Sequence, residues 1–331
     1  MSRIRKVVIT EFGDESKLAV VEGDLPDPAA GEVQVAVRYS IVSGSDVNMR
    51  RGVYPLQKKA PLTPGYSILG AVLSNGKGSS KFKPGDVVAC LSKYEGQAER
   101  INLPERFLVA VPDGVDQKAA VALVLDWMTA YEMLHRSAKI KAGQTVFIHG
   151  MGGGVGGALL ALASLAGAKV FGTAAKSKHE ELRASGAVPF DYSDKKWIDA
   201  VKLKGGVDAV FDPLGYKSFD ESYSILRKGG ILVAYGMNLP ILTKTPRGPF
   251  LPVILKLFAR NLLFWSGKRT TFFGLNRRSK HFKPDLELLF QWLKAGKLKV
   301  PIKATYRLDE IQQAHQAYEK GVGVGSIVME I

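Results

Sequence analysis

The stretch VFIHGMGGGVGGALLALASLAGAKVFGTAAKSK (Val146–Lys178) passes from an apolar run through clustered glycines into an Ala/Leu-rich segment and back to an apolar run. The apolar runs at 145–149 and 169–172 predict strands, and the segment at 155–166 predicts a helix. A strand, a helix and a second strand at this spacing form a βαβ unit, from which parallel sheets are built. The stretch therefore predicts an α/β fold with a parallel sheet.

The glycines between the first strand and the helix predict a phosphate-binding turn. Gly152-x-Gly154-x-x-Gly157 matches the dinucleotide-binding pattern, and it has the preceding strand and following helix that the pattern requires. Glycines let the backbone approach a phosphate closely, and the first N–H groups of a helix are free to bind an anion. The alternative is a tight strand-to-helix turn that binds nothing.

The end of the second strand carries no acidic residue. NAD-binding sites often place Asp or Glu about 20 residues after the glycines, where it binds the ribose 2′-hydroxyl. Here Phe171–Ala175 contains no acid, and Lys176 and Lys178 follow closely. A carboxylate would repel a 2′-phosphate, whereas a lysine pairs with it. The pattern favours NADPH over NADH, and the alternative is that both lysines are solvated residues at a helix start.

Composition limits the class of protein. The chain has 331 residues, a length that predicts two domains. Of these residues 46% are hydrophobic and 23% are charged, which is ordinary for a globular protein. No run has the length of a membrane span or the pattern of a signal peptide. The single cysteine, Cys90, excludes an intramolecular disulfide and a cysteine-based zinc site, and it favours a cytoplasmic protein.

The formal net charge is +15. A field of this sign attracts nucleotides, acyl-CoA, nucleic acids and acidic lipids alike, so charge alone selects no partner. The basic residues are scattered, with a local concentration at 256–278. A basic but otherwise ordinary surface is the alternative, and the chain has no RNA-binding motif, so nucleic acid is not an expected partner.

The rest of the chain divides into a β-rich part and an alternating part. Short apolar runs separated by Gly and Pro fill the first ~120 residues and predict a small barrel or sandwich. From residue 145 strands and helices alternate, as in parallel sheets. Residues 250–265 predict an apolar, basic helix, and further helices are expected at 284–294 and 308–320 before a last strand at 326–331.

Several motifs, in this order, carry a resemblance that covers essentially the whole chain. They are GSDVNMRRGVYP (44–55), TPGYSILGAV (63–72), FKPGDVV (82–88), MTAYEML (128–134), IHGMGGGVG (148–156), GTAAKSKHEELRASGA (172–187), DYSDKKW (191–197), VDAVFDPLG (207–215) and YGM (235–237). The sequence resembles the zinc-independent medium-chain dehydrogenase/reductases, in the quinone oxidoreductase branch. Its C-terminal half is most similar to the VAT-1-like group.

The resemblance implies a Rossmann domain and a GroES-like β-rich domain, with the active site in the cleft between them. It implies a first part of the GroES-like catalytic domain at 1–124, a Rossmann NADP-binding domain at 125–270, and a returning segment at 271–331 that completes the first domain. Motifs alone could not show that the tail returns. By the same resemblance, an edge strand of the Rossmann sheet would form a homodimer.

The resemblance also allows a test for zinc. In metal-dependent relatives the catalytic ligands are Cys, His and Cys, and the matching positions here are Ser43, Tyr66 and Leu125. Leucine cannot ligate a metal, and serine and tyrosine are poor zinc ligands. No metal is therefore expected. Without a Lewis acid, the reduction of a quinone or of a C=C bond conjugated to a carbonyl is favoured over alcohol dehydrogenation.

Cofactor contacts are carried over to the positions that match the family. The pyrophosphate would lie against Gly152, Gly153, Gly154 and Val155. The 2′-phosphate would meet Lys178 and Lys176, with Tyr192 beside the adenine ribose. The nicotinamide end would contact Thr129, Tyr235, Gly236, Met237 and Phe273. Ser326 departs from the family pattern, in which a lysine is frequent, so a cofactor contact is not expected there.

Hydride transfer to an enone or a quinone needs a donor to the developing oxyanion. Tyr54 matches a tyrosine implicated in catalysis in this branch and in zinc-free enoyl-thioester reductases; the alternative is an aromatic wall of the substrate cleft. Asn48 and Tyr66 are further candidate donors, and so is Ser43. For Asn48 and Ser43 a role in capping or in a turn is an equal alternative.

These expectations combine into a soluble NADPH-dependent oxidoreductase of the cytoplasm. Its substrate would be a small hydrophobic quinone, enone or enoyl thioester. A second hypothesis is a VAT-1-like lipid- or membrane-associated protein with little catalysis. It rests on the basic apolar segment 248–273, which would line a substrate tunnel, face a dimer partner or touch an anionic membrane surface. Ordinary packing is the alternative for that segment.

Overall fold

The computed structural model describes residues 2–243, 245, 248–321 and 323–331. The chain forms two compact units, one made of Met1–Met128 with Asn276–Ile331 and the other of Thr129–Leu275. These boundaries lie a few residues after positions 124 and 270, where the sequence interpretation places them. Each unit has its own sheet and its own buried core.

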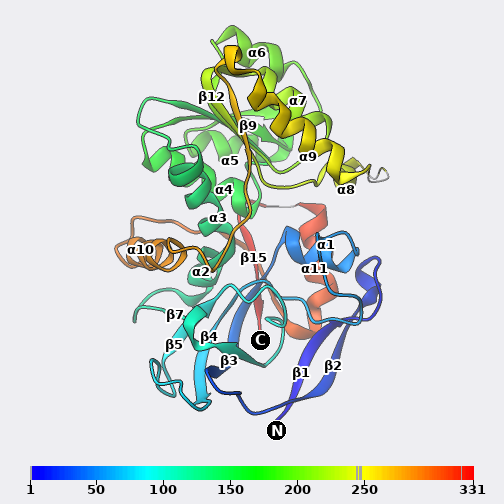
Figure 1. Ribbon diagram of the computed structural model, residues 1–331, viewed down its shortest axis with the longest axis vertical. Helices are drawn as coiled ribbons and strands as arrows, with labels where there is room; N and C mark the ends of the chain where they lie inside the picture. Colours follow the sequence, from blue (N-terminus) through cyan, green and yellow to red (C-terminus); the bar gives the residue numbers. More distant parts are fainter. Residues whose placement is uncertain (1, 244, 246–247, 322) are drawn as a thin grey trace. The chain divides into compact units, whose positions relative to one another are not determined.

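The second unit is built on a six-stranded parallel sheet in the order β10-β9-β8-β11-β12-β13 (Figure 1). The strands are β8 (Thr145–His149), β9 (Lys169–Ala174), β10 (Val188–Asp191), β11 (Val207–Asp212), β12 (Leu226–Ala234) and β13 (Arg269–Phe272). The first three run outward from β8 on one side and the last three on the other, which is the doubly wound order. The predicted α/β fold is confirmed.

Helices connect the parallel strands. They are α4 (Gly154–Leu165), α5 (His179–Ala184), α6 (Trp197–Leu203), α7 (Lys217–Ser224), α8 (Leu239–Thr243) and α9 (Phe250–Ala259). Every residue of β8 is buried, and the Phe147 ring stacks on Trp197 with 4.8 Å between centroids. A strand covered on both faces reads as a continuous apolar run, which is why the sequence predicts it clearly.

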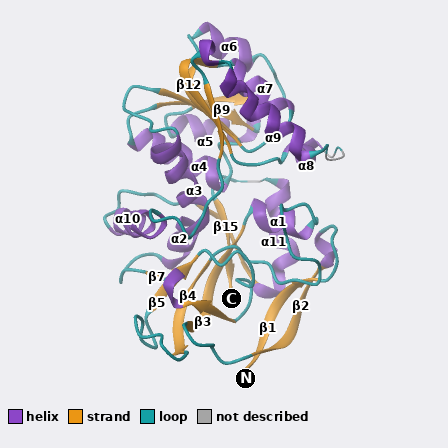
Figure 2. Cartoon of the chain, in the orientation of Figure 1, coloured by secondary structure: helices purple, strands orange, loops and turns teal. Residues whose placement is uncertain are grey.

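The first unit is β-rich (Figure 2). Its strands are β1 (Ser2–Ile9), β2 (Leu18–Leu25), β3 (Glu32–Val42), β4 (Ile68–Asn75), β5 (Val87–Cys90), β6 (Arg100–Pro104), β7 (Val109–Ala110), β14 (Ile302–Arg307) and β15 (Ser326–Glu330). A seven-stranded sheet has the order β14-β15-β3-β4-β5-β7, with β6 also on β3. Because β15 pairs with β3, the C-terminal segment completes the fold of the first unit.

The helices of the first unit are short apart from one. They are α1 (Gly44–Arg50), α2 (Gln117–Ala122), α10 (Phe282–Lys294) and α11 (Ile311–Lys320). The run that starts with α2 continues through a π-helical turn at Leu123–Trp127 and α3 (Met128–Tyr131). Cys90 is fully buried in the core of this unit, opposite Ile68 on the neighbouring strand.

Candidate functional site

The six parallel strands of the second unit end at one edge of their sheet, the edge at which doubly wound folds bind ligands. The segments that follow β8, β9 and β10 are the glycine-rich turn, the two lysines and Tyr192. The segments that follow β12 and β13 begin with Tyr235 and Phe273. The topology therefore brings the predicted cofactor residues to one edge, apart from Thr129, a buried residue of α3.

The glycine-rich turn leaves the start of α4 without a side-chain cap. Gly153 is the N-cap residue and no side chain accepts from the first helical N–H groups, so these donors face outward from the helix end. A Cβ added to Gly156 would lie 2.1 Å from the carbonyl oxygen of Gly150. That contact is impossible for any other residue type, so Gly156 lets the helix approach the turn.

Lys178 lies over this turn. Its Nζ donates a hydrogen bond of 3.3 Å to the carbonyl oxygen of Gly152, and a Cβ at Gly152 would collide with the lysine side chain. Burial lowers the pKa of Lys178. Lys176 is exposed one residue after the N-cap of the same short turn. Two cations thus follow β9, and one of them is already held against the glycines.

The nicotinamide-end candidates follow two neighbouring strands. Tyr235–Met237 comes directly after β12, and the backbone N–H of Phe273 donates to the carbonyl oxygen of Ala234 at 2.7 Å. Met237 is buried, while Tyr235 and Phe273 are partly exposed. Tyr192, after β10, is 61% exposed, so its ring is available to a ligand at the sheet edge.

A buried hydrogen-bond network ties the ends of three central strands together. His149 Nδ1 lies 3.1 Å from Thr173 Oγ1, and His149 Nε2 lies 3.0 Å from Ser222 Oγ. Asp212 Oδ2 accepts from the hydroxyls of Ser222 and Ser218 at 2.6 and 2.7 Å. Burial lowers the pKa of His149, so the imidazole is neutral and holds the strand ends in register rather than acting as an acid.

In the first unit, Asp46 positions the loop that carries Tyr66. Its Oδ2 accepts from the Ser43 hydroxyl at 2.6 Å, and its Oδ1 accepts from the Gly65 N–H at 2.9 Å. Asp46 is fully buried, and burial raises its pKa against the opposing effect of these hydrogen bonds. Ser43 and Asp46 form a capping box on α1, so capping, the alternative given for Ser43, is what its hydroxyl does.

Tyr54 and Tyr66 form a hydroxyl pair. Their hydroxyl oxygens lie 2.7 Å apart, and their rings meet edge to face at 5.9 Å between centroids. Burial raises the pKa of both hydroxyls, so both remain neutral hydrogen-bond donors at physiological pH. One proton joins the pair and the other can be donated outward, which is the requirement for stabilising an oxyanion.

Asn48 contributes to this site through its backbone. It is partly buried on α1, and its carbonyl oxygen accepts the N–H of Val53 at 2.9 Å. This bond turns the chain back after α1 and brings the following residue, Tyr54, towards Tyr66. Asn48 is therefore a residue of helix α1, and Tyr54 lies in the segment that follows this helix.

Lys93 and Tyr94 lie beside the tyrosine pair, and sequence reasoning did not find them. Lys93 Nζ lies 6.0 Å from the ring centroid of Tyr54 and 5.7 Å from that of Tyr94. The Tyr94 hydroxyl is buried and has no hydrogen-bond partner among the described residues. Lys93 has a backbone φ of 75°, a conformation that lysine rarely adopts. The sequence around Lys93 contains no pattern that predicts this conformation.

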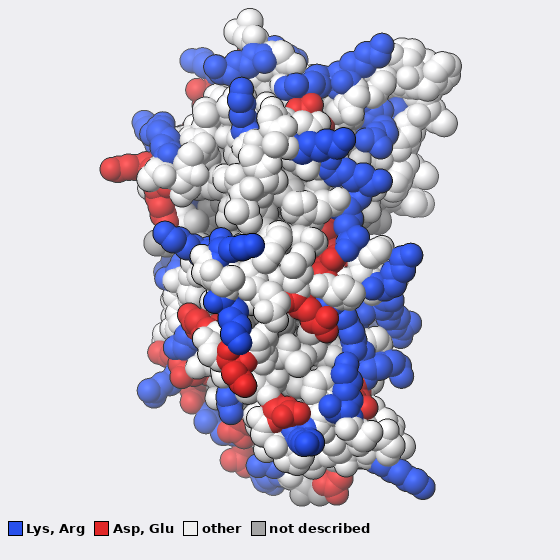
Figure 3. Space-filling view, turned by 90° about the vertical axis from the view of Figure 1, so that its left-hand side faces the viewer, with Lys and Arg blue, Asp and Glu red and all other residues white. Residues whose placement is uncertain are grey.

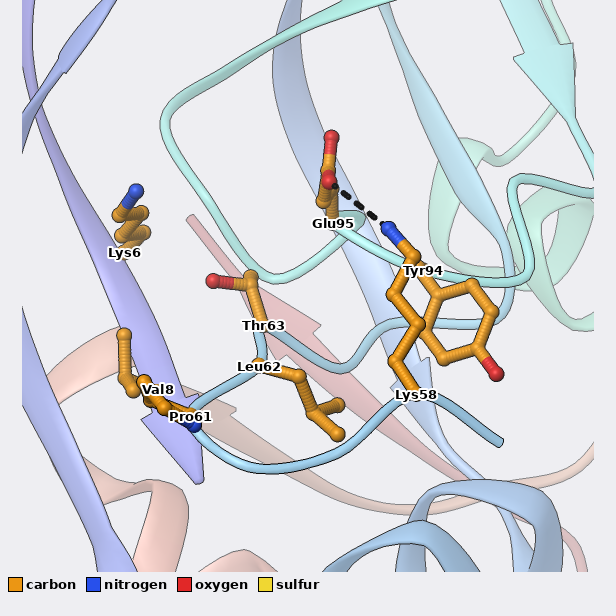
Figure 4. A pocket seen from close by; sticks show the side chains of 8 residues that line it. All are labelled: Lys6, Val8, Lys58, Pro61, Leu62, Thr63, Tyr94 and Glu95. Carbon is orange, nitrogen blue, oxygen red and sulfur yellow. Dashed lines mark ion pairs between the residues drawn. The ribbon is translucent and has the colours of Figure 1, made fainter. Parts of the chain in front are cut away.

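Tyr94 also lines a pocket of about 370 Å³ (Figure 4). The Lys58 ammonium forms an ion pair with the Glu95 carboxylate, with 3.6 Å between Nζ and Oε1. The Tyr94 hydroxyl points away from Lys6 and Thr63. The Lys58 ammonium also lies 5.0 Å from the Tyr94 ring centroid. The ion pair and the ring contact hold Tyr94 in place from this side.

The three positions that match zinc ligands of relatives are engaged in other contacts or apolar. The Ser43 hydroxyl binds Asp46, the Tyr66 hydroxyl binds Tyr54, and Leu125 is a buried residue of the π-helical turn. Among the described residues, no group of three or more His, Cys, Asp and Glu side chains is arranged to hold a metal ion. This donor set does not fit zinc.

Two family models match the chain. Residues 29–122 match the alcohol dehydrogenase GroES-like domain, and residues 186–329 match the zinc-binding dehydrogenase family. The matches cover parts of both units. The GroES-like match lies within the β-rich first unit, and the second match runs from the second unit into the C-terminal segment of the first.

The chain is similar to several known proteins, among them two from Rattus norvegicus and one from a mycobacterium. It is 33% identical over 273 residues to the synaptic vesicle membrane protein VAT-1 homolog of Rattus norvegicus, covering 78% of this chain and 68% of that protein. It is 28% identical over 324 residues to the quinone oxidoreductase of the same organism, covering 95% and 93%. A mycobacterial structure complexed with NADPH is 27% identical, with a TM-score of 0.86 over 99% of this chain and 100% of that one.

Proposed function

Because the chain belongs to the medium-chain dehydrogenase/reductase superfamily, in its quinone oxidoreductase and VAT-1-like branch, we propose that it is an NADPH-dependent reductase. Its substrate would be a quinone or the C=C bond of an α,β-unsaturated carbonyl compound. The position of Lys178 over the glycine-rich turn carries the proposal, since a cation there fits a 2′-phosphate and the strand end holds no acid to oppose it.

The residues at the sheet edge fit NADPH. The uncapped start of α4 would receive the pyrophosphate, because its N–H donors and helix dipole favour an anion. Lys178 would exchange its bond to Gly152 for the 2′-phosphate, with Lys176 and Tyr192 beside it. Tyr235, Gly236, Met237 and Phe273 would hold the nicotinamide end. When bound, NADPH supplies the hydride.

The tyrosine pair would stabilise the charge that develops on the substrate oxygen. Two neutral hydroxyls 2.7 Å apart form a short chain in which one polarises the other. Since burial raises the pKa of both, we favour hydrogen-bond donation over complete proton transfer. The proton that completes the reduction would then come from solvent. The reaction as proposed uses no zinc.

Incubation with NADPH and a panel of quinones, enones and enoyl thioesters tests this proposal. We expect loss of absorbance at 340 nm with at least one class, and faster loss with NADPH than with NADH. Product analysis then distinguishes reduction of a quinone from reduction of a C=C bond. No oxidation above the enzyme-free rate across the panel would contradict the proposal.

A second candidate function is binding to an anionic membrane surface with little catalysis. The observation that favours this function is a run of exposed large apolar side chains on α9 and the turns after it. They are Phe250, Leu251, Leu255, Phe258, Leu262, Leu263, Phe264 and Trp265. Phe264 is 83% exposed and Trp265 is 68% exposed, and Lys268 and Arg269 follow directly. None of the described helices has the length and apolarity needed to cross a bilayer, so binding would be interfacial.

Flotation with anionic liposomes at two salt concentrations tests the second function. Under it, the wild-type chain floats at low salt and the double variant Phe264→Ala/Trp265→Ala does not. Leu165→Ala, an exposed apolar residue at the end of α4, is the matched control and should float normally. Equal flotation of all three proteins, or of none, would remove this function.

We further propose that the protein is a cytoplasmic homodimer joined through the outer side of β13, the last strand of the parallel sheet, beside Thr270, whose backbone Asn261 already bonds. An edge strand presents backbone groups that a second copy can pair with. The N–H of Phe273 bonds β12, so the alternation along a strand points the N–H of Phe272 outward. Phe272→Pro would remove that outward donor and should convert the dimer to a monomer in light scattering. A wild-type monomer would contradict the proposal. Cell fractionation tests the cytoplasmic assignment.

A further inference from the structure

The first unit contains a basic pocket of about 550 Å³. Its walls are Arg106, Phe107, Arg277, Arg278, Ser279, Lys280, Lys283, Pro284 and Glu287. They come from the turn at Glu105–Phe107, from the segment before α10 and from the first turns of α10. Five cations and one carboxylate therefore line a single pocket.

The cations of the basic pocket outnumber its one carboxylate, Glu287. In the described ranges, Arg106, Arg277, Arg278, Lys280 and Lys283 form no ion pair, whereas Lys256 and Arg260 share Asp220 elsewhere. Burial lowers the pKa of Lys283, and Lys81 lowers it further, against the weaker effects of Glu287 and Glu105. An arriving anion would relieve this repulsion.

Two of the cations are held in place before any ligand arrives. The Arg277 guanidinium lies 4.2 Å from the ring centroid of Phe107 and donates to the carbonyl oxygen of Leu91 at 2.8 Å. The Arg106 guanidinium lies 4.8 Å from the same ring. Stacked and hydrogen-bonded guanidinium groups lose little freedom when they bind a phosphate.

The basic pocket adjoins the tyrosine pair within the first unit. Arg277 binds the carbonyl oxygens of Leu91 and Ser92, and the next residue, Lys93, donates its N–H to the carbonyl oxygen of Tyr66 at 3.0 Å. The charge of Arg277 also reaches Tyr66, whose pKa it lowers against the larger effect of burial. One segment of backbone, residues 91–93, thus contacts Arg277 of the basic pocket and Tyr66 of the tyrosine pair.

Across the face of the molecule drawn in Figure 3, basic side chains outnumber acidic ones. A long-range field of this kind draws in any anion, but it does not select where the anion binds. Selection needs cations fixed around a cavity, which is what the basic pocket has and the scattered lysines do not.

We propose that the basic pocket binds the phosphate groups of a coenzyme A thioester, so that the substrate of the tyrosine pair is an enoyl thioester. This inference rests on the reductase function proposed above. A quinone or a simple enone has no phosphate and would make no use of five cations. A coenzyme A thioester carries its phosphates at one end of a long flexible arm and its conjugated C=C bond at the other.

Calorimetric titration with coenzyme A tests the pocket directly. Saturating NADP⁺ keeps the glycine-rich turn occupied, so that coenzyme A cannot bind there instead. The variant Arg278→Glu/Lys280→Glu should bind coenzyme A at least about tenfold more weakly than wild type. Lys297→Glu/Lys299→Glu makes the same change in charge at exposed positions of the same unit and should stay within about twofold of wild type. Equal losses in the two variants, or no loss in either, would overturn the inference.

A pair of substrates tests the link to catalysis. Crotonyl-CoA and crotonyl pantetheine share the thioester and the C=C bond, but only the first carries phosphate. In the wild type, KM should be at least about tenfold lower for crotonyl-CoA, and the pocket variant should remove that difference without changing kcat for crotonyl pantetheine. Equal KM values in the wild type would overturn the inference.

The two proposals fail in different ways. If quinones are reduced and neither thioester is, the reductase function stands and this inference is wrong. If no substrate is reduced while the pocket variant still loses coenzyme A, the reductase function is wrong and the assignment of the pocket's ligand stands.

Discussion

The hydroxyl oxygens of Tyr54 and Tyr66 lie 2.7 Å apart. Asp46, which forms the capping box of α1 with Ser43, also accepts the N–H of Gly65, the residue before Tyr66. One buried carboxylate therefore connects the start of a short helix to a pair of neutral phenols. The pair is a positioned donor, and its orientation is set by contacts that involve no substrate.

Removing either hydroxyl should slow reduction. Tyr54→Phe and Tyr66→Phe are each expected to lower kcat by about tenfold or more, because an oxyanion loses a preorganised donor. If the two act as one chain, the double variant falls no further than the more impaired single variant. Stopped-flow absorbance at 340 nm measures the rates.

Tyr306→Phe, on β14 in the same unit, is the control and should leave kcat unchanged. Unchanged kcat in both Tyr54→Phe and Tyr66→Phe would assign the pair to the wall of the substrate site. Multiplying losses in the double variant would show that the two hydroxyls act separately.

Charge reversal at Lys178 should change the choice of cofactor. Lys178→Glu is expected to weaken NADPH by on the order of tenfold to a hundredfold, because the 2′-phosphate loses a cation and meets a carboxylate. Affinity for NADH should change far less. Titration of nicotinamide fluorescence measures both without catalysis.

Lys176→Glu is the matched comparison, since Lys176 is exposed and has no bond to the glycine-rich turn. It should weaken NADPH less than Lys178→Glu does. Equal weakening of NADPH and NADH by Lys178→Glu would show that the lysine does not meet the 2′-phosphate.

A methyl group at Gly156 should damage the turn. The added carbon would lie 2.1 Å from the Gly150 carbonyl oxygen, whereas at Gly153 the nearest atom is 3.4 Å away. We expect Gly156→Ala to cost about 1–3 kcal/mol of unfolding free energy, as overpacking does. Gly153→Ala should cost less, since only the N-cap preference is lost. Urea unfolding measures both, and equal stability of the two variants would contradict the close approach.

Stability should depend on pH through Asp126. Its Oδ2 accepts the Ser326 hydroxyl at 2.6 Å, and burial raises the pKa of Asp126 from 3.8 to about 6. Between these values the folded state binds more protons than the unfolded state, so the stabilising proton is lost as pH rises. A shift of this size costs about 3 kcal/mol above pH 6.

Asp126→Asn should therefore be more stable than wild type at pH 7.5 and close to it near pH 4. Chemical unfolding at several pH values measures the difference. Asp113→Asn, at an exposed loop position, should show no such trend. A difference between Asp126→Asn and wild type that does not vary with pH would contradict the raised pKa.

The sequence predicts the parallel sheet well because its strands are buried on both faces. The expected strand at 145–149 coincides with β8. Because the strands are parallel, the segments that follow them, which contain the predicted cofactor residues, meet at one edge of the sheet. Strands of the first unit are harder to find. β2 mixes charged residues and a glycine with apolar ones and does not alternate between buried and exposed positions. β6 alternates, but it has only two buried apolar residues, Ile101 and Leu103, in five positions, which is too short a pattern to stand out from a loop.

The helix expected at 250–265 ends at Ala259. Asn261 explains the early end: its side chain accepts the N–H of Thr270 at 2.7 Å and donates to the Thr270 carbonyl oxygen at 3.0 Å. A side chain that replaces a strand partner for β13 competes with helix continuation. The partner lies nine residues further along the chain, beyond the reach of helical periodicity.

Within the candidate site, single residues were predictable and their contacts were not. The motifs predict Tyr54 and Tyr66 singly, but the hydrogen bond between their hydroxyls depends on the loop that joins them. Asp46 had a usable signal, since Ser43 followed three residues later by an acid is a capping-box pattern. Arg277 had none, because one arginine among many cations acquires a role only when Phe107 and the Leu91 carbonyl meet it.

The burial of Cys90 has a consequence for a protein that handles electrophiles. Quinones and enones alkylate thiolates, and only the thiolate is strongly nucleophilic. Cys90 is the only cysteine of the chain; it is fully buried, and burial raises the pKa of its thiol to about 11. The folded protein thus offers its proposed substrates no reactive thiolate. Because the β-rich core buries Cys90, this core protects the protein from alkylation of its cysteine by the electrophiles it is proposed to reduce.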